Sequence, residues 1–317
     1  MTHRDRRRFE VSVPATSANL GPGFDCMGIA LQMYNDIELE TGVPFEILIE
    51  GEAAHLLPTD RSNAVIVAID RLLDEIGATR VPRDWRVRMV NRIPVGSGLG
   101  SSASAIVGGL VLGNALAQAF QPECAISTAD VLRIATDMEG HPDNVTPALL
   151  GGATLSCPDD IGTHTFAVPI PSHLHFVVAV PYFALYTEES RKVVPTSFPR
   201  SAAVFNAAQS ARLILALTTG NLSLLRGGFG DKLHEPYREP LIPGYADVKR
   251  LALHAGALAV TLSGAGPSML AWCDEEHKAW EVADQMTLAW REHGIACEAH
   301  VFQPVASPTV VREVALG

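Results

Sequence analysis

The sequence is short of positive charge. Lysine and arginine number 24 against 35 aspartate and glutamate residues, so the formal net charge at pH 7 is −11. A nucleic-acid-binding protein normally presents a basic face, and this acidic balance argues against a nucleic-acid partner. The balance still allows a local cationic pocket, and it is compatible with a site that uses a metal cation.

The sequence also lacks a membrane-length apolar run and any recognisable cysteine pattern. No stretch reaches about 18 consecutive apolar residues, so we predict no transmembrane helix. Residues 1–8 are basic but lead into a strand-like segment, which indicates a solvated tail rather than a signal peptide. The five cysteines are scattered and without C-x-x-C spacing, which fits unpaired thiols in a reducing cytoplasm and gives no zinc signature. We therefore expect a cytoplasmic protein with no membrane partner.

The chain has enough apolar material for two domains. Its 317 residues are 47% hydrophobic and 19% charged, which is typical of a folded globular protein. Helical spacing predicts a helix over 62–76, and residues 34–39 and 44–50 are expected to form a pair of strands joined near Gly42. Residues 157–160 indicate a domain boundary. The elements expected after it follow the order of a split β-α-β layer, with strands and helices at 175–180, 200–217, 257–262, 269–273, 276–293 and 296–302.

A glycine-rich loop lies within residues 94–104, where Gly96, Gly98 and Gly100 alternate with other residues. Glycine lets the backbone adopt positive φ and approach a ligand closely. The apolar run that follows predicts a buried helix, and unpaired N–H groups at a helix N-terminus suit a polyphosphate. Ser101 or Ser102 could add a hydroxyl to a bound Mg²⁺. The loop has no lysine at the helix start, so it is not the usual P-loop; a glycine-rich turn capped by serine is the alternative interpretation.

Two further loops of small residues and one polar cluster accompany the glycine loop. The loops span 14–25 and 263–268, each at the end of a strand-like run, where α/β-type proteins tend to place ligands. The cluster spans 139–144, where Gly140 is expected to end one helix and Pro142 to begin the next. That structural role does not exclude a functional one.

Taken in order, these segments resemble the signature motifs of the GHMP kinases, the family named for galactokinase, homoserine kinase, mevalonate kinase and phosphomevalonate kinase. Residues 14–25, 94–104 and 263–268 correspond to the three motifs. Segments 139–144 and 235–244 resemble the branch that phosphorylates homoserine. The resemblance implies an α+β protein with a ribosomal-S5-type domain over 1–158 and a ferredoxin-like domain over 159–317. It also implies ATP and substrate bound between the domains, and a homodimer.

The implied activity is that of an ATP-dependent kinase, which moves the γ-phosphoryl group of MgATP onto the side-chain hydroxyl of L-homoserine for threonine biosynthesis. Such a transfer depends on charge neutralisation and positioning more than on covalent chemistry. Ser102, or Ser101, and Glu139 would hold Mg²⁺ through hard oxygen ligands; Glu139 could equally be an ordinary residue at a helix end. The implied ATP-binding residues are Asn63, which could instead be a helix N-cap, and Pro94, Gly96, Ser97, Gly98, Leu99, Gly100, Ser101 and Ser102.

Homoserine is a zwitterion with a hydroxyl, so its pocket needs an anionic, a cationic and a hydrogen-bonding region. Arg191 and Arg238 match the family's carboxylate-binding arginines, and a bidentate guanidinium suits that task. Considered alone, either arginine would more often be a surface ion-pair partner. Asp25 is expected to meet the substrate ammonium. The other residues implied at the acceptor are Asn19, His141 and Asn144, which would act in catalysis by orienting the hydroxyl, and Gly264.

The general base is not fixed by the resemblance. The first motif offers Thr16 and Ser17 where the mevalonate and galactose branches use a lysine. The hydroxyl is then implied to lose its proton to the phosphate or to solvent, which a loose transition state allows. His141 has a pKa suited to a base, with substrate contact or a structural role as the alternatives. Three other functions stay open: a GHMP kinase for another small hydroxylated substrate, a ligand sensor without turnover, and an interaction module.

Overall fold

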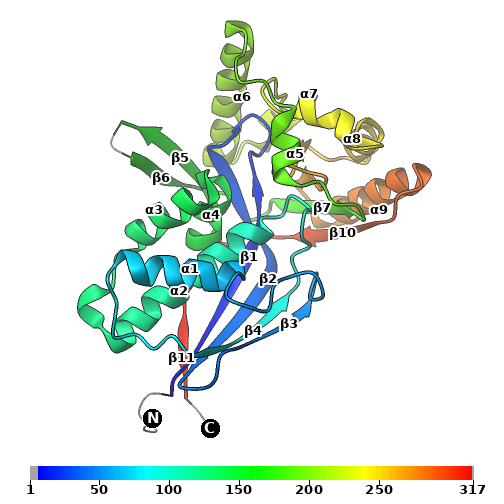
Figure 1. Ribbon diagram of the computed structural model, residues 1–317. Coiled ribbons are helices and arrows are strands. Elements are labelled where there is room, and N and C mark those ends of the chain that lie inside the picture. The colour runs from blue at the N-terminus through cyan, green and yellow to red at the C-terminus, as the bar shows by residue number, and fades with distance from the viewer. Residues whose placement is uncertain (1–5, 161, 316–317) are drawn as a thin grey trace.

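The computed structural model describes residues 6–160 and 162–315 and places them in two β-sheets with helices packed against both (Figure 1). Residues 1–5 of the expected basic tail lie outside the described part. The first sheet has the strand order β11-β1-β2-β4-β3, with β5 paired to β2 and β6 to β5. Its strands are β1 (Arg8–Ala18), β2 (Met27–Thr41), β3 (Glu46–Gly51), β4 (Trp85–Asn91), β5 (Ala153–Asp159), β6 (Gly162–Val168) and β11 (Arg312–Val314).

Helices pack on the first sheet and share one apolar core with β1, β2, β3 and β4. The helix predicted over 62–76 is confirmed as the first of them, because Val65, Ile69, Leu72 and Leu73 recur at helical spacing and are buried. These helices are α1 (Ala64–Glu75), α2 (Ser101–Phe120), α3 (Thr128–Glu139) and α4 (Pro142–Leu150), with a 3₁₀ turn, η2, at Pro122–Cys124.

Helix α2 is the apolar run that follows the glycine loop. By length and composition it could cross a membrane, but 61% of its apolar window is buried inside the fold. Ser104 and Asn114 interrupt the run, which is why no transmembrane helix was predicted from the sequence. A Cβ on Gly109 would overlap the Val65 carbonyl, so this glycine lets α2 lie directly against α1. Helix α2 is therefore the central helix of a packed core.

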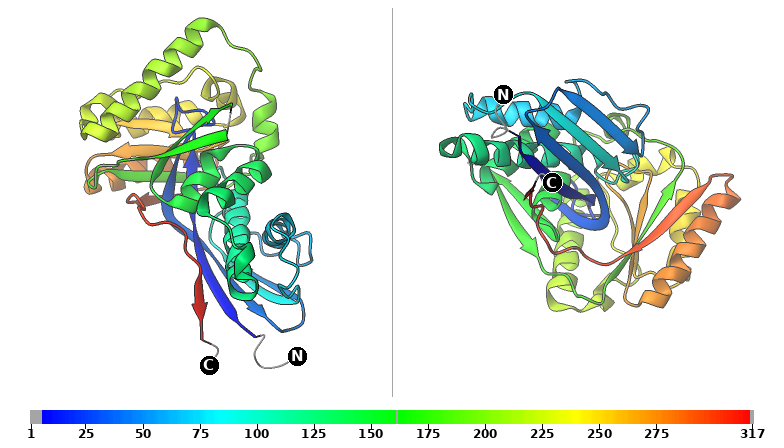
Figure 2. Two further views of the ribbon diagram at one scale, coloured as in Figure 1. Left: turned by 90° about the vertical axis from the view of Figure 1, so that its left-hand side faces the viewer. Right: turned by 90° about the horizontal axis from the view of Figure 1, so that it is seen from below.

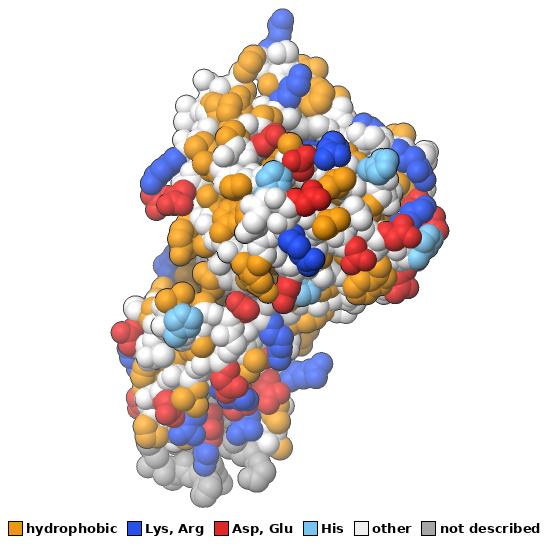
Figure 3. All heavy atoms as spheres, turned by 90° about the vertical axis from the view of Figure 1, so that its right-hand side faces the viewer, with side chains coloured by type: hydrophobic (Ala, Val, Ile, Leu, Met, Phe, Trp, Pro, Cys, Tyr) orange, Lys and Arg blue, Asp and Glu red, His pale blue; other side chains and the backbone are white. Residues whose placement is uncertain are grey.

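Cross-strand ion pairs cover part of the first sheet. Arg86 meets Glu46 at 2.8 Å, and Arg88 meets Glu50 at 2.9 Å, in both cases between β4 and β3. The face of the molecule in Figure 3 has acidic and basic side chains interspersed over its lower part. Exposed pairs of this kind each contribute little stability, so their main effect is to keep the surface solvated.

The second sheet has four antiparallel strands in the order β10-β7-β9-β8. This is the ferredoxin-like order, as expected. The uniformly apolar β7 has a core on each side: Phe176, Val178 and Val180 face a core shared with the first sheet, while Val177 and Ala179 face α8 and α9. The strands are β7 (His175–Pro181), β8 (Ala259–Leu262), β9 (Met269–Cys273) and β10 (Cys297–Phe302).

The remaining elements surround the second sheet. Figure 2 shows α6 across the top of the molecule in its left-hand view and α9 beside β10 in its right-hand view. The elements are α5 (Thr187–Lys192), α6 (Arg200–Thr219), η3 (Leu222–Leu225), α7 (Glu235–Arg238), η4 (Glu239–Leu241), α8 (Tyr245–His254) and α9 (Glu276–Glu292).

One predicted strand pairing is wrong. Strands β2 and β3 follow each other around Gly42, but β4 lies between them in the sheet. β3 pairs with β4 in parallel, from Glu46 opposite Arg86 to Gly51 opposite Asn91. Parallel strands need a crossover connection, and α1 supplies it. The helix predicted over 62–76 lies between β3 and β4 in the sequence, so it indicated that these two strands are parallel.

The domain boundary expected after residue 158 falls inside β5. Residues 158–160 lie at the turn of a hairpin, in which Asp159 is paired with Gly162 and β6 continues the first sheet. Strand β11 returns to the same sheet and pairs with β1, from Arg8 opposite Val314 to Glu10 opposite Arg312. The first sheet therefore extends to residue 168 and includes residues 312–314. Proline and two acidic residues indicated a domain boundary, whereas here Pro158 and Asp159 end β5 and Asp160 begins the hairpin turn.

Candidate active site

The three loops and the polar cluster meet around one cavity of about 190 Å³. The glycine loop follows β4 and starts α2, the first-motif loop follows β1, the third joins β8 to β9, and the cluster joins α3 to α4. The cavity wall contains most of the predicted site residues, namely Asn19, Pro94, Gly96, Ser97, Gly98, Leu99, Gly100, Ser101, Ser102, Glu139, His141, Asn144, Arg191, Arg238 and Gly264. Asn63 and Asp25 do not line it.

The glycine loop turns its N–H groups away from the rest of the protein. Gly96, Gly98 and Gly100 have φ values of +68°, +81° and +69°, and the residues between them have negative φ. Such alternation directs successive N–H groups toward one concavity that suits an anion. Among the described residues, none of the N–H groups from Gly96 to Ala103 donates a hydrogen bond. The loop is therefore a row of unused donors at the wall of the cavity.

Four successive carbonyls of the same loop, from Gly96 to Leu99, accept hydrogen bonds. They accept these hydrogen bonds from three other segments, which fixes the loop while its donors stay unpaired. The pairs are Leu185 N–H to Gly96 (2.9 Å), Ser268 N–H to Ser97 (3.1 Å), Ser263 Oγ to Gly98 (2.9 Å) and Thr16 N–H to Leu99 (3.1 Å). A Cβ on Gly100 would overlap Thr16 Oγ1, so the loop and the first motif touch directly.

Ser102 and Glu139 lie together at the start of α2. Ser102 Oγ donates a hydrogen bond to Glu139 Oε2 at 3.0 Å, and both residues line the cavity. Burial raises the pKa of Glu139, although His141 and the Ser102 hydroxyl act in the opposite direction. Among the described residues, no three His, Cys, Asp or Glu side chains gather to hold a metal by themselves. A hydroxyl and a carboxylate fit Mg²⁺, which usually completes its shell with water and phosphate oxygens.

His141 lies between two helices and is paired with a buried carboxylate. Gly140 ends α3 at φ +86° and Pro142 begins α4, as predicted. His141 Nδ1 lies 2.6 Å from Asp143 Oδ1. Burial lowers the pKa of His141, but the hydrogen bond and charge of Asp143 outweigh it, so the pKa is raised overall. Asp143 lines the cavity but was not predicted as a site residue, because an aspartate in the first turn of a helix is expected for its favourable interaction with the helix dipole.

The two asparagines are tied to the neighbouring loops. Asn19 Nδ2 donates to the Gly264 carbonyl at 2.9 Å, and its Oδ1 accepts the Asp25 N–H at 3.0 Å. Asn144 Oδ1 accepts from Thr16 Oγ1 at 2.8 Å, which leaves its amide N–H groups without a partner among the described residues. Asn19 therefore joins the first and third motifs, whereas Asn144 has donors to spare at the cavity.

Asp25 and Arg191, predicted to meet opposite charges of the substrate, are paired with each other. Arg191 Nη2 lies 2.6 Å from Asp25 Oδ1, and Nη1 lies 3.3 Å from Oδ2. Burial lowers the pKa of Arg191, and the Asp25 contact outweighs this and raises it overall. Both groups are about one-third exposed. The sequence placed both residues near the acceptor but gave no signal of their mutual contact.

Arg238 is the most buried cation of the site. The residue is 1% exposed, and no carboxylate within the described residues forms an ion pair with it. Nη1 donates to the Gly264 carbonyl at 3.0 Å and lies 3.2 Å from His234 Nδ1. Burial and then the charge of Arg191 lower its pKa to about 10. A cation that is desolvated and forms no direct ion pair is arranged to receive an anion.

Asn63 is placed away from the cavity. Its Oδ1 accepts the Val65 N–H at 3.0 Å and its Nδ2 donates to the Pro58 carbonyl at 2.8 Å, so it is the N-cap of α1. The alternative interpretation of this residue is confirmed, and contact with adenine stays a prediction. Sequence reasoning missed Phe24, whose ring lies under the guanidinium carbons of both Arg191 and Arg238, at 5.9 and 5.4 Å.

Comparisons with known proteins show the family of the chain. The family model for the GHMP kinases N terminal domain matches residues 63–152, and that for the GHMP kinases C terminal matches 213–292. A homoserine kinase of Trichormus variabilis is 45% identical over 287 residues, which cover 90% of this chain and 92% of the relative. One of Moorella thermoacetica is 41% identical over 95% of this chain and 99% of the relative.

Solved structures give the same result. The crystal structure of homoserine kinase from Cytophaga hutchinsonii superposes with a TM-score of 0.84 at 28% identity, covering 98% of this chain and 99% of that one. A mevalonate kinase of L. major shares the fold, with a TM-score of 0.67 at 17% identity, 94% of this chain and 97% of that one being covered. The protein is an ATP-dependent kinase, and the chain belongs to the homoserine kinases of the GHMP kinase family.

Proposed function

We propose that the protein transfers the γ-phosphoryl group of MgATP to the side-chain hydroxyl of L-homoserine, giving O-phospho-L-homoserine for threonine biosynthesis. The observation that carries the proposal is that one cavity is lined both by residues 96–102, whose N–H groups are unpaired among the described residues, and by Arg238, which forms no ion pair there. The first set suits a polyphosphate and the second suits a carboxylate. A kinase acting on an amino acid needs both within reach of each other.

The nucleotide end of the site would be the glycine loop. Its N–H groups and the positive end of the α2 dipole favour negative charge at this point. Ser102 and Glu139 would hold Mg²⁺, which when bound offsets the charge of the phosphate chain. The loop needs no rearrangement to accept phosphate, because its carbonyls already have partners elsewhere.

The acceptor end would be built around the Asp25–Arg191 pair and Arg238. A zwitterion set against this ion pair can place its ammonium on Asp25 and its carboxylate on the two arginines. Each charge of the substrate then meets an opposite charge. Asp25 and Arg191 separate from each other, and each pairs with a charge of the substrate instead. Gly264 would lie beside the substrate backbone.

Positioning rather than proton abstraction would drive the transfer. Asn144 has free amide N–H groups, and Asn19 and His141 stand beside it at the cavity. These side chains would orient the hydroxyl toward the phosphoryl group, which suffices for a loose transition state in which the nucleophile develops little charge. A role for His141 as base remains the competing hypothesis.

The proposal extends to location and assembly. We infer a cytoplasmic enzyme, from the unpaired cysteines, and a homodimer, from the family resemblance. Light scattering behind a sizing column tests the assembly, and a mass near 33.9 kDa would refute the dimer.

A coupled ADP-release assay across a panel of acceptors tests the activity. We expect strong turnover with L-homoserine and none with mevalonate or galactose, with the phosphorylated product identified by mass spectrometry. Turnover restricted to a different hydroxylated acceptor would move the protein to another GHMP kinase activity. Binding of ATP and homoserine without ADP release would indicate a sensor instead.

A further inference from the structure

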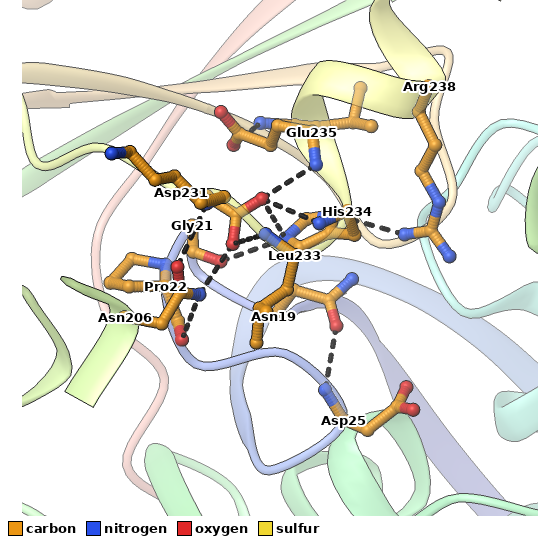
Figure 4. A network of polar contacts seen from close by, with 12 residues as sticks. Asn19, Gly21, Pro22, Asp25, Asn206, Asp231, Leu233, His234, Glu235 and Arg238 are labelled. Atoms are coloured by element: carbon orange, nitrogen blue, oxygen red, sulfur yellow. Dashed lines mark hydrogen bonds and ion pairs between the residues drawn. The ribbon is translucent and has the colours of Figure 1, made fainter. Parts of the chain in front are cut away.

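His234 is wholly buried beside the cavity and does not itself line it. It stands at the start of α7, one turn before Arg238, in a network that reaches the first-motif loop (Figure 4). The backbone around it is held by Asp231, whose Oδ2 accepts the N–H groups of His234 and Glu235, both at 2.7 Å. The backbone from which the imidazole extends is therefore fixed in position.

Both ring nitrogens of His234 have partners, and the partners define its protonation. Nδ1 lies 3.2 Å from Arg238 Nη1, and Nε2 lies 2.8 Å from the Gly21 carbonyl. A guanidinium nitrogen can only donate and a carbonyl can only accept. Nδ1 is thus the acceptor and Nε2 carries the hydrogen, so the imidazole is neutral. The Asp231 carboxylate is 3.8 Å from Nε2, too far for a hydrogen bond.

The contact with His234 decides which edge of Arg238 is used inside the protein. Nη1 is engaged by His234 and by the Gly264 carbonyl, and Nε approaches the Ser190 carbonyl at 3.4 Å. Nη2 has no hydrogen-bond partner among the described residues. The side of the guanidinium left for a ligand is therefore the Nη2 side.

The same network sets the distance between the arginine and the first motif. The Gly264 carbonyl accepts from Asn19 as well as from Arg238, and His234 donates to Gly21 two residues further along. The Phe24 ring stacks on the imidazole with centroids 4.9 Å apart and an interplanar angle of 14°. The guanidinium is thereby held against a loop whose Asn19 would orient the hydroxyl.

We propose that His234 is a positioning residue that fixes where the acceptor's carboxylate binds. Its neutral imidazole accepts a hydrogen bond from Arg238 and donates one to the Gly21 carbonyl, and it thereby holds the free edge of the guanidinium at a fixed distance from Asn19. This inference rests on the proposed function. It makes His234 a determinant of specificity for carboxylate-bearing acceptors, although the residue touches no substrate itself.

Two amide substitutions separate the two hydrogen bonds of the imidazole. The side-chain oxygen of asparagine is bonded to Cγ, as Nδ1 is in histidine, so His234→Asn can keep an acceptor for Arg238. The amide nitrogen of glutamine lies one bond further from Cα, as Nε2 does in histidine. His234→Gln can therefore keep the donor to Gly21, and it loses the acceptor for Arg238. Comparing the two variants shows which of the two hydrogen bonds affects binding of the acceptor.

The assay uses L-homoserine and 3-aminopropan-1-ol, which keeps the hydroxyl and ammonium but has no carboxylate. We expect His234→Gln to raise the KM for homoserine about tenfold or more, because a hydrogen bond to a charged group is lost, with the KM for ATP within about twofold. The preference for homoserine over 3-aminopropan-1-ol should fall by the same factor. His234→Asn should change both quantities much less.

Two results would overturn the inference. One is an equal loss with both acceptors in His234→Gln, and the other is a larger loss of preference in His234→Asn than in His234→Gln; either would indicate a purely structural histidine. If His234→Gln does not fold, Phe24→Leu removes the ring stacked on the imidazole, and an unchanged preference would refute the inference. Wild-type protein without turnover on homoserine would instead refute the proposed function, and the inference with it.

Discussion

Replacing Arg238 by methionine should separate acceptor binding from stability. Burial and then the charge of Arg191 lower the pKa of Arg238 from its ordinary value to about 10. One pKa unit is about 1.4 kcal/mol, so the charged form costs the folded protein about 3 kcal/mol. Because the folded-state pKa lies below the unfolded value, this cost is present at every pH below about 10, where the side chain is charged.

Methionine has a similar length and no charge, so the variant escapes this cost. The substitution leaves His234 Nδ1 without a hydrogen-bond donor among the described residues, and it leaves Asn19 as the one side-chain donor among them to the Gly264 carbonyl. These losses lower the unfolding free energy by about 1–3 kcal/mol. The net change in unfolding free energy should lie between zero and a gain of about 2 kcal/mol. An arginine whose main role was a structural ion pair would instead cost about 3–5 kcal/mol on removal.

Binding of the acceptor should respond in the opposite direction. Loss of a buried, charge-assisted contact with a carboxylate costs about 2 kcal/mol or more, so the KM for homoserine should rise at least about 30-fold. The KM for ATP should stay within about twofold, because the glycine loop is untouched.

Thermal unfolding and acceptor kinetics on the same preparation test both halves. Arg226→Met is the matched control, since Arg226 forms an exposed pair with Asp274 at 3.1 Å and lies outside the cavity wall; it should change neither quantity measurably. A marked fall in Tm together with parallel rises in both KM values would refute the reasoning, because Arg238 would then support the fold rather than the acceptor.

Three further variants test other parts of the site. Glu139→Gln should lower kcat about 100-fold and raise the Mg²⁺ concentration needed for half-maximal rate; an unchanged Mg²⁺ titration would remove Glu139 from the metal site. Gly100→Ala should abolish ATP binding through overlap with Thr16, whereas Gly220→Ala, at a similar φ of +70° with open space around it, should cost only about 1–2 kcal/mol of stability and leave ATP binding intact. The raised pKa of His141 means that its charged form stabilises the fold below about pH 6.5 and that this stabilisation is lost as pH rises through the folded-state pKa, so His141→Gln should lower Tm more near pH 5.5 than near pH 8.5; an equal loss would contradict this.

The local chemistry of the site could be predicted from the sequence. Glycine permits the positive φ found at Gly96, Gly98 and Gly100, and the turn from Gly140 to Pro142 ends one helix and starts another by rules that involve only neighbouring residues. Each predicted loop follows a strand or joins two helices, which is why they converge at one end of the fold. The placing of Ser102 beside Glu139 follows from these two helix ends.

The pairings between distant segments could not be predicted in this way. Asp25 and Arg191 attract each other whenever the acceptor does not separate them, and no local pattern records that contact. His234 resembles any histidine before a proline-containing turn until the fold brings Gly21 and Arg238 to its two nitrogens. The strand order was missed for a similar reason, because β3 gains its partner only after α1 has crossed the sheet.

The return of β11 to the first sheet has a consequence for how the chain can mature. The edge of β1 at residues 8–10 is closed by residues 312–314, and Arg7 adds an ion pair to Glu313 at 2.6 Å. During synthesis on the ribosome, an otherwise finished amino-terminal half would keep that edge open until residues 312–314 have been made. Until then the open edge of β1 is exposed to strand pairing with other chains, and the arrival of β11 closes it.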